Sequence, residues 1–157
     1  MEKINVSNTL RLRMPQKSEW DLALPWYENP KVMYLSEGIS DEVYTLFNIY
    51  NMYEFLSTRG DFYYIEVLEN NKWKPIGDVT LWDENLPIAI GDETYWGQGI
   101  GRQVLLALIE RAKQKGMKKL LVPAIFHYNI ASQKLFESVG FVLVSENETE
   151  KSYELIL

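Results

Sequence analysis

The chain of 157 residues contains no cysteine and a single histidine. Without cysteine, disulfide bonds and thiolate metal sites are excluded, and we expect no metal site. No apolar run approaches the roughly 20 residues that a membrane helix needs. The first residues, MEKINVSNTLRLR, lack the apolar stretch of a signal peptide. We therefore expect a cytoplasmic protein with no membrane partner.

Basic residues are also scarce, with 16 Lys and Arg against 22 Asp and Glu and a net charge of -6. Proteins that bind nucleic acid need clustered positive charge, so we expect no nucleic-acid partner. The acidic balance is compatible with a cationic or amine partner, although many proteins of this charge bind none.

The sequence contains enough apolar residues to form one hydrophobic core. The hydrophobic content is 46%, and 157 residues is the length of one ordinary domain, residues 1–157. Hydrophobic periodicity and turn residues predict seven strands and four helices. The strands are expected at 9–14, 62–68, 73–82, 86–90, 119–126, 141–144 and 152–157. The helices are expected at 18–27, from Ser40-Asp41-Glu42 to about Leu56, at 101–115 and at 129–139.

This order of elements predicts an α/β fold in a single domain. Hairpins come early, and a strand–helix–strand–helix–strand run follows. We expect one mixed, mostly antiparallel central sheet with helices on both faces.

The stretch GDETYWGQGIGRQVL, residues 91–105, carries the clearest chemical signal. Glycines at 97, 99 and 101 lead into a helix, so backbone N–H groups can approach a ligand without obstruction by Cβ atoms. The unpaired N–H groups of the first helical turn and the positive end of the helix dipole add to the attraction for an anion. This arrangement predicts a phosphate or pyrophosphate site, with Arg102 at its rim.

Two familiar phosphate loops do not fit these residues. The P-loop requires GxxxxGK[ST], but the residue five after Gly97 is Arg102 and no Lys-Ser or Lys-Thr follows a glycine. The dinucleotide fingerprint GxGxxG/A fails at Arg102 and at Val104. A glycine-rich turn that only connects strand to helix stays an alternative.

Two motifs in order resemble the GNAT superfamily of N-acetyltransferases. YWGQGIGRQVL is similar to the family signature Q/R-x-x-G-x-G/A, with Gly99 and Gly101 matching and Trp96 standing where Gln or Arg is usual. NIASQKLFESVGF, from Asn129, is similar to the second motif. The early segment WYENPKVMYL, residues 26–35, also resembles members that acetylate ribosomal-protein N-termini or aminoglycosides.

The resemblance implies acetyl-CoA as cosubstrate. In the family, the glycine-loop amides hold the CoA pyrophosphate, and the pantetheine arm lies between two splayed parallel strands, here 86–90 and 119–126. The cofactor-binding residues implied in this way are Ile88, Ala89, Ile90, Trp96, Gly97, Gln98, Gly99, Ile100, Gly101, Arg102, Asn129 and Phe136.

The sequence departs from the family at two acid/base positions. Phe136 stands where many members have a tyrosine that protonates the departing CoA thiolate, and a phenylalanine has no proton to give. Ala124 stands near a position where members that modify ribosomal proteins often have a glutamate.

Replacement catalytic residues are sought among Glu84, His127 and Tyr128, with Asp83 and Glu93 as further carboxylates. His127 suits base chemistry because its unperturbed pKa is near neutrality, but it also fits a partly exposed strand end. Tyr128 could supply the missing hydroxyl, or it could be a packed aromatic with a solvated tip.

In the family, the early helices line the side of the site that binds the acceptor. The substrate-side candidates are Trp26, Tyr27 and Tyr34, with the acidic Glu28 and Glu37. The expected function is therefore transfer of an acetyl group from acetyl-CoA to a primary amine, on a small molecule or a peptide. The alternative is a catalytically weak acyl-CoA-binding regulatory or interaction module. A homodimer is left open.

Overall fold

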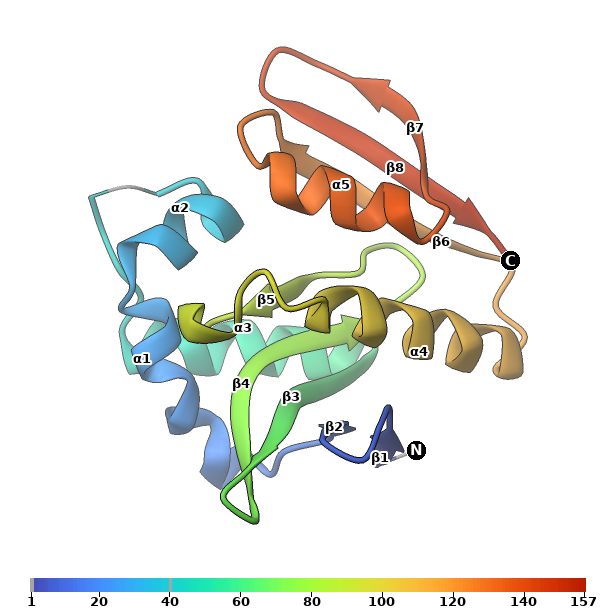
Figure 1. The fold of residues 1–157 in the computed structure, drawn as a ribbon. Coiled ribbons are helices and arrows are strands. Elements are labelled where there is room, and N and C mark those ends of the chain that lie inside the picture. Colours follow the sequence, from blue (N-terminus) through green and yellow to red (C-terminus); the bar gives the residue numbers. More distant parts are fainter. Residues whose placement is uncertain (1, 40) are drawn as a thin grey trace.

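The computed structural model describes residues 2–39 and 41–157. Its strands form two antiparallel sheets (Figure 1). The larger sheet has the order β1-β2-β3-β4-β5, and the smaller has the order β6-β8-β7. The bounds are Lys3–Asn5 (β1), Leu10–Arg13 (β2), Asp61–Glu69 (β3), Lys72–Leu81 (β4), Ile88–Ile90 (β5), Lys119–Phe126 (β6), Val142–Glu146 (β7) and Glu150–Ile156 (β8).

The long hairpin of β3 and β4 is the centre of the larger sheet. Its turn is Asn70-Asn71, both with positive φ (53° and 62°), a conformation that asparagine tolerates better than most residues. The pairing is in register from Asp61↔Leu81 to Glu69↔Lys72, with an irregularity at Ile65/Glu66. On β4, Asp78 lies opposite Ala89 of β5.

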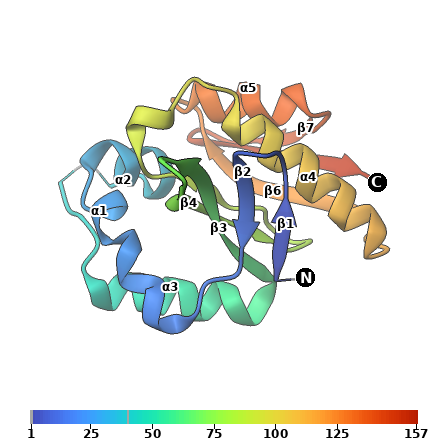
Figure 2. The ribbon, with the colours of Figure 1, turned by 60° about the horizontal axis from the view of Figure 1, so that its bottom comes forward.

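Helices cover both faces of the larger sheet, as Figure 2 shows. The 3₁₀ helix η1 (Lys17–Ala23), α1 (Leu24–Tyr27) and α3 (Leu46–Arg59) lie on one face, and α4 (Ile100–Gln114) lies on the other. The remaining elements are α2 (Pro30–Glu37), the short 3₁₀ helix η2 (Glu93–Tyr95) and α5 (Ile130–Ser138), which lies beside the smaller sheet (Figure 1).

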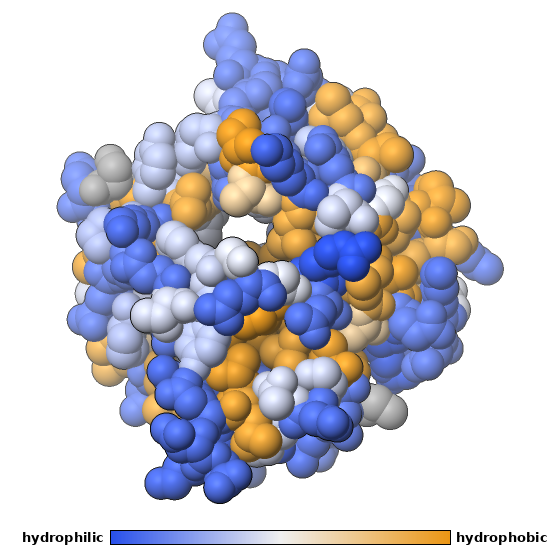
Figure 3. Space-filling model, in the orientation of Figure 1, coloured by the Kyte–Doolittle hydropathy of each residue, from blue (hydrophilic) through white to orange (hydrophobic). Residues whose placement is uncertain are grey.

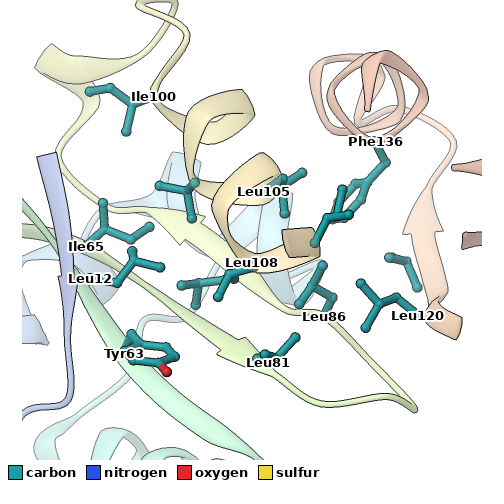
Figure 4. Packing of buried hydrophobic residues seen from close by; sticks show 14 of the residues in the cluster. Leu12, Tyr63, Ile65, Leu81, Leu86, Ile100, Leu105, Leu108, Leu120 and Phe136 are labelled. Carbon is teal, nitrogen blue, oxygen red and sulfur yellow. The ribbon is translucent and has the colours of Figure 1, made fainter. Parts of the chain in front are cut away.

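One apolar core joins the two sheets. Leu105 and Leu108 of α4 are fully buried in the same cluster as Tyr63 and Ile65 of β3, and the cluster continues to Phe136 of α5 (Figure 4). A second buried cluster, rich in aromatic rings, lies between β3 and the helices η1, α1 and α3. Packing therefore holds the sheets together along α4.

Three predictions about the fold need correction. The central sheet is divided: every described strand pair is antiparallel, and no pair joins β5 to β6. The helix α2 is not among the four predicted helices, because a proline at position 30 is also typical of a segment that follows the end of a helix. Pro30 is instead the first residue of α2, where its missing N–H costs nothing, and Asn29 caps it by accepting from Lys31 N at 3.0 Å.

The third correction concerns the start of α3. The sequence predicts a start at Ser40-Asp41-Glu42, but α3 begins at Leu46, and Ser40 lies outside the described residues. Thr45 caps the helix reciprocally with Asn48: its Oγ1 accepts from Asn48 N, and Asn48 Oδ1 accepts from Thr45 N at 2.9 Å. The capping pair of Thr45 and Asn48 sets the start of the helix, and not the acidic residues that precede it.

Candidate functional site

A cavity of ≈ 670 Å³ fills the gap beside β5. Its lining combines β5, the glycine loop and the starts of α4 and α5 with residues from α1, α2, α3 and β4. In the orientation of Figure 1, the surface is hollowed near its centre, between the places of α2, α5 and β5, and apolar side chains border part of the hollow (Figure 3). The divided sheet thus leaves room for an elongated ligand.

The glycine loop lines this cavity. Gly97 and Gly99 have φ values of 74° and 77°, and a Cβ atom added at either would meet nothing within 4 Å. Glycine is therefore required for the left-handed backbone and not for packing. The amides of residues 97–102 donate no hydrogen bond to another described residue, so they are free for an anion at the N-terminus of α4.

The free edge of β5 also lines the cavity. Thr80 N donates to Pro87 O and Gly91 N donates to Ile76 O, so the odd-numbered residues direct their backbone groups to β4. By alternation, Ile88 and Ile90 direct theirs across the gap, while Ala89 pairs with Asp78. The indole of Trp96 donates to Ile90 O at 2.7 Å. The groups left for a ligand are both backbone groups of Ile88 and the N–H of Ile90.

A buried carboxylate faces the cavity from β4. Asp78 is only 4% exposed, and its Oδ2 accepts hydrogen bonds from the hydroxyls of Tyr27 and Tyr53, each at 2.6 Å. Desolvation raises the pKa of Asp78 to about 6, although the two tyrosine hydrogen bonds oppose the rise. Oδ1 accepts no hydrogen bond from the described residues. The site thus holds a carboxylate that ionises just below neutral pH and has a free oxygen.

A second carboxyl, that of Glu37 at the end of α2, lines the same cavity. Desolvation also raises its pKa, and a hydrogen bond from Tyr44 opposes that effect. The charge of Glu37 contributes to the raised pKa of Asp78. The two acids therefore favour a positively charged ligand group in the part of the cavity near α2.

Contacts from α2 close the cavity on one side. The ring of Tyr34 stacks on Tyr128 at 4.2 Å between centroids, and Tyr128 Oη donates to Tyr34 O at 2.6 Å. Asn129 Nδ2 donates to Leu35 O at 3.3 Å, while Asn129 Oδ1 caps α5 by accepting from Ser132 N. These contacts join the helical layer to the smaller sheet across the gap.

Comparison with known proteins identifies the family. The model of the family described as "Acetyltransferase (GNAT) domain" matches residues 9–142, which is well over half of the chain. The chain belongs to this family. It is also similar to an uncharacterized protein of Methanocaldococcus jannaschii, with 30% identity over 162 residues. That match covers 99% of this chain and 33% of the relative, so the chain spans about a third of the relative's length.

Solved structures share the fold. A domain from Methanocaldococcus jannaschii matches with a TM-score of 0.78 at 29% identity, covering 94% of this chain and 98% of that one. RimL, a ribosomal alpha-N-protein acetyltransferase solved in complex with coenzyme A, matches with a TM-score of 0.79 at 19% identity, covering 99% and 98%. The single α/β domain expected from the sequence is thereby confirmed as a GNAT fold.

Most of the GNAT cofactor positions predicted from the sequence lie together. The cavity is lined by Ile88, Ala89, Ile90, Trp96, Gly97, Gly99, Ile100, Gly101, Arg102, Asn129 and Phe136. Gln98 does not line it; its side chain donates to Thr94 O at 3.0 Å. Phe136 is buried against Phe141, and Ala124 lines the cavity. At the two family acid/base positions, the cavity wall is therefore apolar.

The predicted catalytic residues lie elsewhere. Glu84 is exposed in the turn after β4, and neither it nor His127 nor Tyr128 lines the cavity. His127 Nε2 lies 2.7 Å from Asn147 O. The hydrogen bonds of His127 and Tyr128 fit their structural alternatives, a partly exposed strand end for His127 and a packed aromatic for Tyr128.

Some of the substrate-side candidates line the cavity and others do not. Tyr27 lines the cavity, whereas Trp26 is buried beneath Gly91 and beside Tyr64, and Tyr34 belongs to the stack with Tyr128. Glu93 pairs with Lys31 outside the cavity. Sequence reasoning missed Asp78. The available signal was a lone carboxylate in the middle of a predicted strand, in PIGDVTLW.

Within residues 2–39 and 41–157, no helix combines the length and the apolar character needed to cross a bilayer. In the same part of the chain, no three His, Asp or Glu side chains are grouped as metal ligands.

Proposed function

We propose that the protein transfers an acetyl group from acetyl-CoA to a primary amine. The observation that carries the proposal is one cavity whose lining includes both the glycine loop, with its free backbone amides, and a carboxylate with a free oxygen. The family relationship supports acetyl transfer, and the RimL structure with coenzyme A supports the choice of carrier. The cytoplasmic location and the homodimer stay predictions from the sequence.

The residues present fit acetyl-CoA. The amides of residues 97–102 and the side chain of Arg102 suit its pyrophosphate. The free groups of Ile88 and Ile90 suit the amides of the pantetheine arm, which would extend the larger sheet by strand-like pairing. The thioester would then lie beside β5, within the cavity that Asp78 also lines.

The chemistry assigned to Asp78 is that of a general base. An alkylammonium has an ordinary pKa near ~10.4, so it must lose a proton before its nitrogen can attack. Asp78 Oδ1 takes this proton directly or through water. A C–N bond then forms at the thioester carbonyl, the C–S bond breaks, CoA leaves as a thiolate, and the nitrogen gives its second proton to water as the amide forms. Tyr27 and Tyr53 are positioning residues that hold the carboxylate through Oδ2.

Asp78→Asn tests this assignment. We expect kcat/KM, measured by CoA release, to fall by roughly 10²–10⁴-fold, the range of general acid–base catalysis, with acetyl-CoA affinity retained. In the wild type, kcat/KM rises with pH through about 6, where Asp78 loses its proton. That rise disappears in the variant, and the remaining pH dependence follows the free amine.

Glu84→Gln is the matched control, because Glu84 is an exposed carboxylate off the cavity. It should leave the rate and its pH profile unchanged. If Asp78→Asn retains full activity, the base lies elsewhere. If the wild type binds acetyl-CoA but releases no CoA with any amine, the apolar wall at Ala124 and Phe136 favours the alternative of a catalytically weak acyl-CoA-binding module.

A further inference from the structure

The part of the cavity lining that α2, α3 and the segment after β4 supply has a composition of its own. We call this part the acceptor wall; it comprises Val32, Leu35, Ser36 and Glu37 of α2, Met52, Phe55 and Leu56 of α3, and Trp82 and Asn85 after β4. Six of these nine side chains are apolar. Phe55 and Trp82 meet edge to face, with centroids 6.0 Å apart.

Charge on this wall has one sign. Glu37 is its charged member, and Asp78 lines the cavity beside it. Arg102 is the cationic lining residue, and it lies on α4 beside the glycine loop. Arg59 stacks over the ring of Phe55 at 4.8 Å but does not line the cavity. The wall therefore offers a cation its counter-charges and offers an anion none.

The number of polar groups limits the acceptor further. A polyamine or an aminoglycoside carries several ammonium or hydroxyl groups, each of which loses water on entering the cavity and needs a partner there. Besides Glu37, the polar side chains among the nine residues of the acceptor wall are those of Ser36 and Asn85. An apolar substituent, in contrast, gains free energy against Met52, Phe55, Leu56 and Trp82.

We propose that the acceptor is a primary amine carried on an apolar body of about the size of an aromatic ring. The ammonium group lies between Glu37 and Asp78, and the apolar body lies against Phe55 and Trp82. This inference rests on the proposed acetyl transfer and specifies its substrate class. The same chemistry is present in a free arylalkylamine and in a peptide whose first residue is phenylalanine.

A panel of acceptors separates the sources and the rival classes. CoA release is measured with 2-phenylethylamine, Phe-Gly-Gly, Ser-Gly-Gly, spermidine and kanamycin. We expect at least tenfold higher kcat/KM for 2-phenylethylamine or Phe-Gly-Gly than for spermidine, kanamycin or Ser-Gly-Gly. Comparison of the first two tells a free amine from a peptide N-terminus.

Variants on α3 test the contact itself. Phe55 is 49% exposed, so Phe55→Ala should fold, and we expect it to raise KM for the apolar acceptor about tenfold while KM for acetyl-CoA stays unchanged. Phe55→Glu should shift the preference toward spermidine. Phe47→Ala is the matched control, because Phe47 is on the same helix, 73% exposed and off the cavity.

The outcomes are distinguishable. Preference for spermidine, kanamycin or Ser-Gly-Gly, or an unchanged KM in Phe55→Ala, overturns the assignment of the acceptor and leaves the proposed acetyl transfer standing. Release of CoA with none of the five amines, in protein that binds acetyl-CoA, overturns the proposed function and this inference with it.

Discussion

Asp78 carries an ionisable group in surroundings that resist its ionisation. Its pKa of about 6, against 3.8 for a free aspartate, corresponds to about 3 kcal/mol that favours the protonated form in the fold. Because the folded pKa is the higher one, the stabilisation is present below pH 3.8 and is lost as the pH rises through about 6. A neutral side chain would avoid this loss. The carboxylate is better explained by chemistry than by stability.

Phe136 raises the complementary question of how the thiolate leaves. The side chain is 2% exposed, lines the cavity and packs edge to face on Phe141. We expect Phe136→Tyr to retain CoA affinity and to keep or increase kcat, because it adds one hydroxyl where relatives carry it. Steady-state kinetics across pH would show a new falling limb at high pH from the added acid.

Tyr128→Phe is the companion variant. Its hydroxyl donates to Tyr34 O, so we expect kcat to stay unchanged and departure of the thiolate to be unassisted. A loss of ~100-fold, the scale of a general acid, would instead give Tyr128 that role. For the Phe136→Tyr variant of the preceding paragraph, a large loss of kcat with intact CoA binding would mean that the pocket has no room for the hydroxyl.

Elements with strong local signals were predictable from the sequence. The strand β6 has the predicted bounds, and α4 and α5 begin within one residue of them, because glycine, asparagine and apolar periodicity all agree there. The helix α2 and the start of α3 were missed, since a proline and an acidic cluster each fit more than one reading. The division of the sheet could not be derived, because strand pairing depends on distant partners.

The candidate site was likewise predictable only in part. The glycine loop was predictable because its function resides in the backbone of one continuous segment. The group of Asp78, Tyr27 and Tyr53 was not, because it joins three elements far apart in the sequence and depends on which face of β4 each residue occupies. The sequence places Asp78 within a predicted strand, but it does not say what the carboxylate contacts.

The N-terminus of α4 offers a matched test of the anion site. Gly99 and Gly116 lie before and after the same helix, with φ values of 77° and 78°, and neither has a neighbour within 4 Å of an added Cβ. Valine at either position therefore brings similar backbone strain, on the order of 1–3 kcal/mol. Since only Gly99 lines the cavity, we expect Gly99→Val to weaken CoA binding at least tenfold more than Gly116→Val.

Calorimetric titration of CoA into the two folded variants makes this comparison. Equal affinities would mean that the glycine loop only connects β5 to α4. A similar loss of melting temperature in both variants would confirm that their strain is matched.

On the scale of the whole molecule, the two sheets are joined on either side of a gap. The core along α4 holds them on one side, and the contacts of Tyr34 and Leu35 with Tyr128 and Asn129 join them on the other. A ligand that pairs with β5 and reaches α5 would touch both halves. Such a ligand binds the folded chain and not the unfolded one, so it must stabilise the fold.

We therefore expect acetyl-CoA to raise the melting temperature. At ~100 times its Kd, the ligand adds about 2.7 kcal/mol, which for a chain of this length corresponds to a shift of roughly 5–10 °C. Differential scanning fluorimetry would detect it, and the absence of a shift at millimolar acetyl-CoA would contradict binding. Asp78→Asn should keep the shift while losing turnover. Loss of both would mean that the carboxylate maintains the shape of the cavity, because a base that acts only on the amine is not needed to hold acetyl-CoA.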